Sequence, residues 1–435
     1  MVQYLRVANV MENRLDLSDV KMMNFTPDEQ AVFLLKPGDI LLNEGQSPHL
    51  VGRPAMYRGE LTPCFFQNTI VRFRANEGVL PGWALLVFRA QMHAMRYKQF
   101  AKITTNIAHL GAERFAQVEF PLPPVTEQRA LLEAFEAHES VLDAAEQGLK
   151  RVRAKLKHAR ASVLKAAVEG RLVPTEAALA RAEGRSYEPA PALLARVLTE
   201  RRARWAERGE RGQYKEPVAP EPEGLPELPE GWTWATTDQV CAAIADGDHL
   251  PPPVTESGVP FLVIGDVRSG QLEFAKCRYV SPEYYESLDW KRRPDSQDLL
   301  YTVVGSLGIP VRILTNRAFC VQRHIAILKA PNISTAYLYW SMQSVFIFRQ
   351  ATAKATGTAQ QTLGLGTLRT IVVPLPPLAE QARIVAEVDR RMSVLDQVEA
   401  LVDRSLSRCA SLRQSILKRA FEGRLVPPSA EVTPE

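Results

Sequence analysis

The sequence predicts an α+β protein in which two similar α/β domains are separated by an antiparallel pair of long coiled-coil helices, with pseudo-twofold symmetry. Three observations support this fold class. Two segments, Pro121 to Pro174 and Pro374 to Pro427, agree at 23 of 54 positions without a gap. Each carries a heptad pattern, and each follows a stretch with the same order of strand-like motifs. The offset of 253 residues far exceeds solenoid periods, so a domain plus a helix has been duplicated.

The repeat and the changes in composition divide the chain into six segments. We expect a first domain at residues 1–120, a first long helix within 121–174, an Arg-rich helical segment and Pro-rich linker at 175–231, a second domain at 232–373, a second long helix within 374–427, and a tail at 428–435.

The two domains show the same order of motifs. YLRVANV, GDILLNEG and CFFQNTIVRFRA in the first correspond to PFLVIGDV, DLLYTVVG and FCVQRHIAILKA in the second. A helix follows in each, at Pro81 to Ala101 and in AYLYWSMQSVFIFRQATAK. Ahead of Pro260 the second domain carries LPEGWTWATTDQVCAAIADGDHLPPPVTESGV, which has no counterpart in the first. We therefore expect the first domain to be N-terminally incomplete as written, by about thirty residues.

The repeated segments have the spacing of coiled-coil helices. Apolar or small residues recur at alternating steps of four and three, from Leu131 to Val163 and again from Ile384 to Ile416, where Arg391 and Ser405 weaken the pattern. Such a pattern over more than four heptads predicts a long helix that buries a narrow stripe against another helix. Gly170 and Gly423 follow the predicted helices, as glycine often does just past a helix C-terminus. The simplest partner for each helix is the other copy, and an antiparallel pairing satisfies two identical units.

Composition excludes several classes of protein. No apolar run approaches the roughly 18 residues of a membrane span, and no secretory signal is visible, so we expect a cytoplasmic protein. The five cysteines are scattered and never form a CxxC pair, which disfavours a disulfide framework and a zinc site. Net charge is +4, but Lys150 to Lys215 holds 17 Lys and Arg against 7 Glu. That local excess fits either a nucleic-acid partner or a solvated helix face.

Together these motifs resemble one family. The two PLPPxxEQ…EGRLVP segments, the YKEPVAP…LPELPEGW linker and the paired YLRVANV…GDIL domains are similar to the DNA-sequence specificity (S) subunit of Type I restriction-modification systems. The resemblance implies two target-recognition domains, each reading half of a bipartite DNA site. It also implies that the helices set the half-site spacing and dock two methyltransferase subunits, and that restriction subunits join that core. S-adenosylmethionine is then expected in the methyltransferase partners, and no cofactor in this chain.

No catalytic motif accompanies the resemblance. An adenine methyltransferase needs a glycine-rich cofactor loop and an Asn/Asp-Pro-Pro-aromatic motif, and neither is found; nor is a Walker A sequence. Asp289-Trp290-Lys291 is a lone nuclease-like pattern without a partner. We therefore expect a non-enzymatic DNA-binding subunit without a metal site.

Base reading requires Arg or Lys for guanine and Asn or Gln for adenine, on loops that reach the major groove. The polar, turn-rich candidates of the first domain are Asn43, Gln46, Ser47, His49, Arg53, Gln67, Asn68, Thr104, Thr105 and Asn106. Those of the second are Ser306, Arg312, Gln322, Arg323, His324, Lys354, Thr356, Thr358, Gln360 and Gln361, with Lys291, Arg292 and Arg293 for phosphates. Each is also compatible with an ordinary polar loop residue.

Two other functions stay open on the sequence. A coiled-coil scaffold could link protein partners without DNA contact, which the heptads and the modest net charge would also fit. A fused restriction-methylation enzyme is disfavoured by the missing motifs and the short chain. Salt-dependent binding to random duplexes separates the scaffold from the DNA reader.

Overall fold

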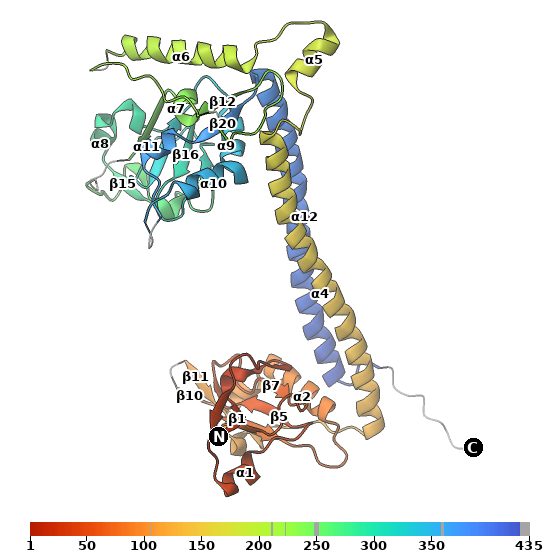
Figure 1. The fold of residues 1–435 in the computed structure, drawn as a ribbon. Helices are drawn as coiled ribbons and strands as arrows, with labels where there is room; N and C mark the ends of the chain where they lie inside the picture. Colours follow the sequence, from red (N-terminus) through yellow and green to blue (C-terminus); the bar gives the residue numbers. More distant parts are fainter. Residues whose placement is uncertain (105, 210–211, 222, 248–251, 358–360, 427–435) are drawn as a thin grey trace. The chain divides into compact units, whose positions relative to one another are not determined.

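The computed structural model describes residues 1–435 except 105, 210–211, 222, 248–251, 358–360 and 427–435 (Figure 1). The chain forms two compact units. Unit 1 comprises Met1–Val152 and Leu401–Glu435, and unit 2 comprises Arg153–Ala400. Each unit holds one α/β domain and one part of each long helix.

The domain of unit 1 contains three small sheets, ordered β4-β1-β8, β7-β5-β9 and β10-β11-β6, and a short β2–β3 ribbon. β1 runs parallel to β8, and its pairing with β4 is antiparallel. The elements are β1 (Val2–Leu5), β2 (Val10–Met11), β3 (Arg14–Leu15), β4 (Lys21–Met23), α1 (Pro27–Phe33), β5 (Ile40–Asn43), β6 (Gly45–Gln46), β7 (Pro54–Met56), β8 (Cys64–Phe66), β9 (Ile70–Phe73), α2 (Pro81–His93), β10 (Lys102–Thr104), β11 (Ile107–His109) and α3 (Ala112–Phe115).

Helix α2 forms the centre of the first core. Its residues from Trp83 to Met92 are all buried, and they pack with Ile40 and Leu42 of β5. Pro81 suits the first helical position because its fixed φ is already helical and its missing N–H has no intrahelical partner there. The predicted helix over Pro81 to Ala101 is shorter than expected, because Met95 takes a left-handed φ of 57° and a 3₁₀ turn at Arg96–Gln99 follows.

The domain of unit 2 repeats two of these sheets, one of them with an added strand, and has a further strand pair. Its sheets are ordered β15-β14-β18, β13-β19-β16-β17 and β12-β20. The elements are β12 (Thr233–Thr236), α7 (Thr237–Val240), β13 (Ala243–Asp246), β14 (Val259–Leu262), β15 (Arg278–Val280), α8 (Pro282–Ser287), β16 (Asp298–Thr302), β17 (Pro310–Arg312), β18 (Cys320–Val321), β19 (Ile325–Lys329), α9 (Thr335–Met342), α10 (Val345–Ala353), α11 (Leu365–Arg369) and β20 (Val372–Leu375).

The predicted correspondence of motifs is confirmed in the strand pairings. The parallel pair β14–β18 corresponds to β1–β8, and β17-β16-β19 corresponds to β7-β5-β9. The second domain replaces the single long helix by α9 and α10, because the Ser344 side chain caps a new helix by accepting from the Ile347 N–H. Trp83 Nε1 donates to the Pro121 carbonyl at 3.0 Å, and Tyr337 Oη donates to the equivalent Pro374 carbonyl at 2.8 Å.

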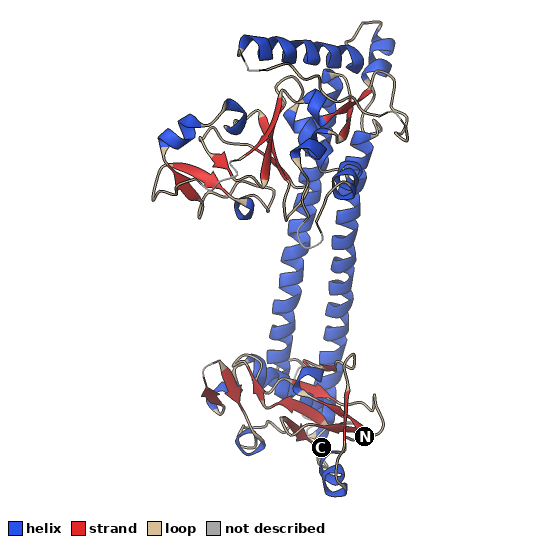
Figure 2. Cartoon of the chain, turned by 60° about the vertical axis from the view of Figure 1, so that its left-hand side comes forward, coloured by secondary structure: helices blue, strands red, loops and turns tan. Residues whose placement is uncertain are grey.

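The long helices are α4 (Val125–Val168) and α12 (Leu378–Phe421) (Figure 2). In unit 1, Arg413 near the end of α12 pairs with Glu139 near the start of α4 at 3.1 Å. In unit 2, Arg160 near the end of α4 pairs with Asp396 of α12 at 2.6 Å. Both contacts require an antiparallel pairing, which confirms that prediction within each unit.

The heptad positions form most of the buried stripe of the helix pair. Leu131, Phe135, Leu142, Leu156 and Val163 are at most 9% exposed, as are Ile384, Val388 and Val402. Four predicted positions fall outside this stripe and are exposed, namely His138, Ala145, Val152 and Leu412. Between α4 and β12 the chain forms α5 (Glu176–Glu183) and α6 (Ala190–Glu207). In the described part of the chain, no helix has both the length and the apolarity that crossing a bilayer requires.

Candidate nucleic-acid interface

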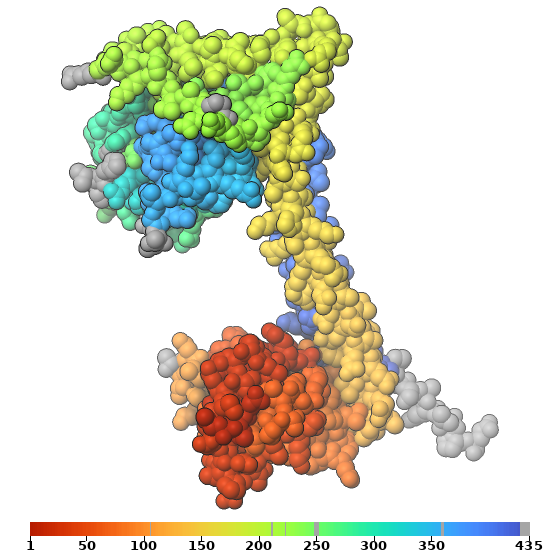
Figure 3. All heavy atoms as spheres, viewed as in Figure 1, coloured from red at the N-terminus to blue at the C-terminus, as the bar shows by residue number. Residues whose placement is uncertain are grey.

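In unit 1, three chain segments meet at one end of β5. The Glu44 N–H, just past β5, donates to the Thr69 carbonyl in the β8–β9 turn at 3.1 Å. The next residues form β6, which pairs with β11 so that Gln46 faces Ala108. The β5–β6 junction, the β8–β9 turn and the β10–β11 hairpin are therefore neighbours, and the hairpin protrudes from the surface of the domain (Figure 3). We call these three segments the domain 1 loop cluster.

Most of the candidates of the first domain lie on this cluster. Ser47, His49, Asn68, Thr104 and Asn106 are exposed, and Gln46 and Gln67 are half-buried. Thr105 lies outside the described residues. The hairpin also exposes Lys102, Ile103 and Ile107, which the sequence reasoning missed. Their signal was the alternation of KIT and NIA around a polar turn, which is typical of a hairpin.

Unit 2 repeats the arrangement at the corresponding end of β16. The Val303 N–H, just past β16, donates to the His324 carbonyl in the β18–β19 turn at 3.0 Å. The Gly305 N–H donates to the Gln361 carbonyl at 3.1 Å, and Val304 bridges Thr362. Thr362 also pairs with Thr356. Residues 303–306, 322–324, 356–357 and 361–362 thus form a domain 2 loop cluster that is equivalent to the first.

The second cluster carries different side chains. Ser306, Arg323, Thr356 and Gln361 are exposed, whereas Gln322 and His324 are half-buried. Burial lowers the pKa of His324, and the neighbouring Arg323 charge adds to that effect, so the imidazole is neutral at pH 7. Thr358 and Gln360 lie outside the described residues.

The structure places some candidates away from solvent or in other contacts. Asn43 is 1% exposed and its Nδ2 donates to the Val10 carbonyl at 3.2 Å, so it is a core residue and not a base reader. Arg53 is half-buried, and the Glu12 carboxylate lies near enough to act on its charge. Arg312 is half-buried with its guanidinium 5.7 Å from the Tyr339 ring centre. Lys354 Nζ donates to the Thr370 carbonyl at 3.2 Å.

The basic run Lys291, Arg292 and Arg293 is not beside the loop cluster of its domain. Ile325, at the start of β19, pairs with Thr302 near that cluster. At the other end of β19, Lys329 Nζ donates to the Arg293 carbonyl at 2.9 Å. The Arg293 guanidinium also donates to the Leu288 carbonyl at 2.8 Å and the Glu286 carbonyl at 2.5 Å. Arg293 therefore supports the local backbone and does not offer a free cation to a phosphate.

Lys291 lines a basic hollow that the sequence reasoning did not define. The hollow measures about 260 Å³, and its lining includes Arg204, Arg208, Lys215 and Arg369, with Asp238 as the carboxylate. The Arg208 guanidinium lies 3.5 Å from the Trp290 ring centre. The signal was the local excess of Lys and Arg between residues 150 and 215. Some of these basic residues, such as Arg204 of α6, line the hollow, which lies beside the start of β13.

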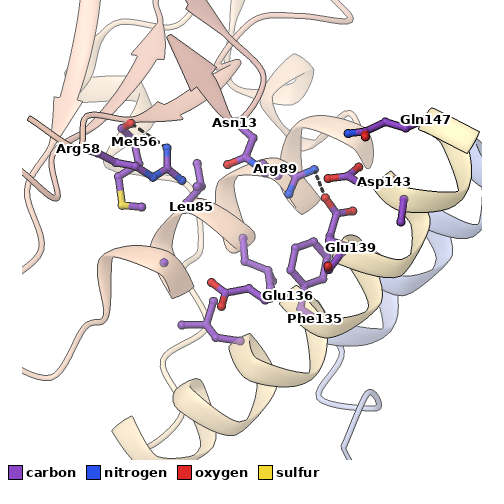
Figure 4. Close-up of a pocket in the computed structure, with 15 residues that line it drawn as sticks. Asn13, Met56, Arg58, Leu85, Arg89, Phe135, Glu136, Glu139, Asp143 and Gln147 are labelled. Carbon is purple, nitrogen blue, oxygen red and sulfur yellow. Dashed lines mark hydrogen bonds and ion pairs between the residues drawn. The ribbon is translucent and has the colours of Figure 1, made fainter. Parts of the chain in front are cut away.

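An ionic chain fixes the first domain on the helix pair, and Figure 4 shows its contact between Arg89 and Glu139. Arg89 of α2 is 5% exposed and lies between Glu12 at 3.2 Å and Glu139 of α4 at 3.6 Å. Glu139 in turn binds Arg413 of α12. Burial raises the pKa of Glu12, but contacts with His93 and Arg89 outweigh it and the net shift is downward. The hollow beside this chain, about 530 Å³, is lined by residues of the domain and of α4.

The described residues offer no obvious catalytic centre. No group of three His, Cys, Asp or Glu in that part of the chain could hold a metal ion. Of the five cysteines, Cys409 is half-buried and those at positions 64, 241, 277 and 320 are buried. Burial raises the pKa of Cys64 to about 11, so its thiol is protonated at pH 7. The loop clusters present amide, hydroxyl and guanidinium groups, which suit hydrogen bonding to base edges.

Known proteins match over most of the chain, although no protein-family model does. The specificity subunit of the type I restriction enzyme EcoBI from Escherichia coli is 26% identical over 330 residues, which cover 74% of this chain and 61% of that protein. The corresponding EcoKI subunit of E. coli K12 is 23% identical over 433 residues, covering 97% of this chain and 82% of that protein. This chain therefore spans about three-fifths of the first relative and four-fifths of the second.

Solved structures agree in fold. A chain from a type I restriction-modification system, described with its complex assembly and conformational transition, has a TM-score of 0.63 at 18% identity and covers 97% of this chain and 91% of that one. The HsdS subunit from Thermoanaerobacter tengcongensis has a TM-score of 0.51 at 19% identity, with 97% and 90% covered. The relatives are named specificity subunits, in agreement with the predicted non-catalytic role. Over most of its length the chain is thus similar to type I restriction specificity subunits, and it shares the fold of the solved structures, with duplicated domains and antiparallel helices.

Proposed function

We propose that this chain reads an asymmetric, bipartite DNA site, with one half-site for each domain. One observation carries the proposal: the same three-segment loop cluster occurs in both domains with different exposed side chains. The first cluster offers Asn68 and Asn106, and the second offers Arg323 and Gln361. Equivalent scaffolds give the same kind of groove contact, while different side chains select different bases. Two unequal half-sites follow, separated by base pairs that the chain does not read.

The exposed groups suggest how each half-site is read. Asn and Gln pair with adenine N6 and N7, and Arg pairs with guanine O6 and N7 in the major groove. The hydroxyls of Ser47 and Thr104 in one cluster, and of Ser306 and Thr356 in the other, suit phosphate or base-edge contacts. A half-site spacing of about one helical turn, roughly 34 to 36 Å or a little more, would place both readers on one face of the duplex.

The proposed partners rest on the similarity to type I restriction specificity subunits. Two methyltransferase subunits would dock on the antiparallel helices and would carry S-adenosylmethionine for adenine methylation, and restriction subunits would join that assembly. This chain would supply the DNA sequence specificity and no chemistry of its own.

A binding-site selection tests the proposal. The complex of this chain with its methyltransferase subunits is offered randomised duplexes at two salt concentrations. The expected product is a motif with two unequal conserved parts and a spacer of fixed length, and binding should fall steeply with salt because phosphate contacts release counterions. Binding without sequence enrichment at either concentration, or no binding at all, would favour the scaffold interpretation instead.

A further inference from the structure

In unit 2, the linker is anchored by a tryptophan on the start of α12. Trp232 Nε1 donates to Glu380 Oε1 at 3.0 Å, and the Glu176 N–H donates to Glu380 Oε2 at 2.8 Å. Glu380 is fully buried and Trp232 is 6% exposed. A buried carboxylate needs such donors, because an unpaired one would lose its hydration without compensation. The indole therefore belongs to a satisfied site and not to a loose surface contact.

Two further contacts complete that site. Gly170 follows α4 with φ +66°, and a Cβ built on it would lie 2.3 Å from Pro229 Cγ and 3.2 Å from Trp232 Cζ2. The linker thus lies directly on the glycine that ends α4. After Trp232 the chain forms β12, which adds to β20 with Thr233 opposite Leu375 and leaves Leu375 only 1% exposed.

Unit 1 repeats the framework of this site at the matching positions. Gly423 has φ +67°, and the Arg424 N–H donates to the Arg419 carbonyl at 2.8 Å, as the Arg171 N–H does to Ala166 at 2.9 Å. Gln128 Oε1 accepts from the Leu80 N–H at 2.9 Å, as Gln381 Oε1 accepts from Ser334. The helix ends and the glutamine clamps are therefore the same in the two units.

The residues that the linker and β12 cover in unit 2 have exposed counterparts in unit 1. Glu127, the counterpart of Glu380, is exposed, and within the described chain its carboxylate has no hydrogen-bond or ion-pair partner. A Cβ on Gly423 would meet Glu127 Oε1 at 3.9 Å and no closer described atom. Leu122, the counterpart of Leu375, is 60% exposed, and residues 119–122 form no strand. Leu122, Glu127 and Gly423 are therefore not covered by described residues of unit 1 in the way that their counterparts are covered in unit 2.

A buried glutamine side chain at the same face of unit 1 also has an unused hydrogen-bond acceptor. In unit 2, Gln350 uses both side-chain atoms on Val372, donating to its carbonyl and accepting from its N–H, each at 2.9 Å. In unit 1, Gln91 is 3% exposed and donates to the Glu119 carbonyl, but its Oε1 has no partner. Gln91 lines a hollow of about 480 Å³ beside Phe120 and Phe421. An orphaned acceptor at such a hollow is a place for a donor from another segment.

We propose that this face of unit 1, made by Leu122, Glu127, Gly423 and the Gln91 hollow, binds an extended segment of a different protein, not of a second copy of this chain. That segment has the pattern Leu-Pro-x-Gly-Trp followed by a short strand. The indole donates to Glu127, the proline lies on Gly423, and the strand adds beside residues 119–122. Strand addition supplies backbone hydrogen bonds, and the indole supplies specificity. The proposal does not depend on DNA recognition.

A labelled peptide tests this site. The probe is the ten-residue peptide LPEGWTWATT, which is residues 228–237 of this chain, with an N-terminal fluorophore, and fluorescence anisotropy measures its binding to the full chain. We expect saturable binding that Glu127→Arg weakens by about tenfold or more, because a hydrogen bond to a charged acceptor is lost. Replacing the first tryptophan of the peptide by phenylalanine should weaken binding similarly. Glu133→Arg, an equal charge change at an exposed position of α4, should bind as the unaltered chain does.

Four results would overturn the proposal. The first is no saturable binding, and the second is equal binding to the Glu127→Arg and Glu133→Arg chains. Self-association of the peptide-free chain that Glu127→Arg abolishes would make a second copy the occupant. Binding that occurs only after deletion of residues 427–435 would make the chain's own tail the occupant. Circular dichroism of both variants shows whether they are folded.

Discussion

The same substitution, asparagine to alanine, made at Asn43 and at Asn68 distinguishes a structural role from a role in base recognition. Asn43 is the last residue of β5 and is 1% exposed, whereas Asn68 lies in the turn between β8 and β9 and is exposed. We expect Asn43→Ala to destabilise unit 1 without changing the selected DNA sequence at temperatures where the chain is folded. Asn68→Ala should leave stability within about 0.5 kcal/mol and relax one base position.

The size of the Asn43 effect follows from its contacts. The substitution removes the donor to the Val10 carbonyl, and Val10 is itself fully buried, so an acceptor is left unsatisfied at a cost of about 1 to 3 kcal/mol. Removing the Oδ1 atom, which has no partner, offsets part of that cost. A net loss of about 1 to 2 kcal/mol results, which corresponds to a fall in Tm of roughly 2 to 8 °C for a unit of this size.

Differential scanning calorimetry measures the first outcome, and binding-site selection with the methyltransferase complex measures the second. If Asn43→Ala melted like the unaltered chain and altered the selected motif, the core placement of this side chain would be refuted. If Asn68→Ala left every base position unchanged, Asn68 would leave the set of readers.

Three further predictions follow from the ionic contacts. Arg413→Ala should lower the free energy of unfolding of unit 1 by about 1 kcal/mol, and by less at high salt because salt screens half-exposed ion pairs. Arg408→Ala, at an exposed position of the same helix, should change it little. Equal melting temperatures of the two variants would contradict this prediction. Because the pKa of Glu12 is lowered in the folded chain, its contribution to the stability of unit 1 is complete above its unfolded pKa, near 4.3, and is lost as the pH falls through the folded pKa. The Tm difference between the unaltered chain and Glu12→Gln should therefore shrink from pH 7 towards pH 3. A difference that stays constant over this range would contradict the prediction. Arg293→Ala should lower the Tm of unit 2 and leave the salt slope of DNA binding unchanged, whereas a flatter slope with an unchanged Tm would restore Arg293 as a phosphate contact.

The sequence predicted the elements that depend on periodicity. Heptad spacing and the repeated EGRLVP marked both long helices, and an internal duplication favoured their antiparallel pairing, because these features depend on local composition and symmetry. The order of strands in the two domains was also predictable from matched motifs. The break between α9 and α10 was not, since it rests on the capping of a helix by Ser344 inside an apolar stretch.

The site was only partly predictable, for physical reasons. All four residues of β5, from Ile40 to Asn43, are buried because both faces of that strand are covered. In the sequence, however, the polar Asn43 at its end resembled the start of a loop. Lys291 to Arg293 come before β16 in the chain, whereas residues 303–306 of the loop cluster follow it, so the length of the strand separates the two groups. The loop clusters themselves were approximated, because turn-rich polar stretches between strands mark loops whatever their tertiary neighbours.

The central claim is that each domain reads its own half-site, and paired single-domain variants test it most directly. Methylome sequencing of cells that carry the unaltered gene, Asn68→Ala or Arg323→Ala reports the methylated motif of each. The account predicts a bipartite motif in which Asn68→Ala relaxes one half only and Arg323→Ala relaxes the other half only. A motif with a single continuous part, or two variants that change the same half, would contradict it.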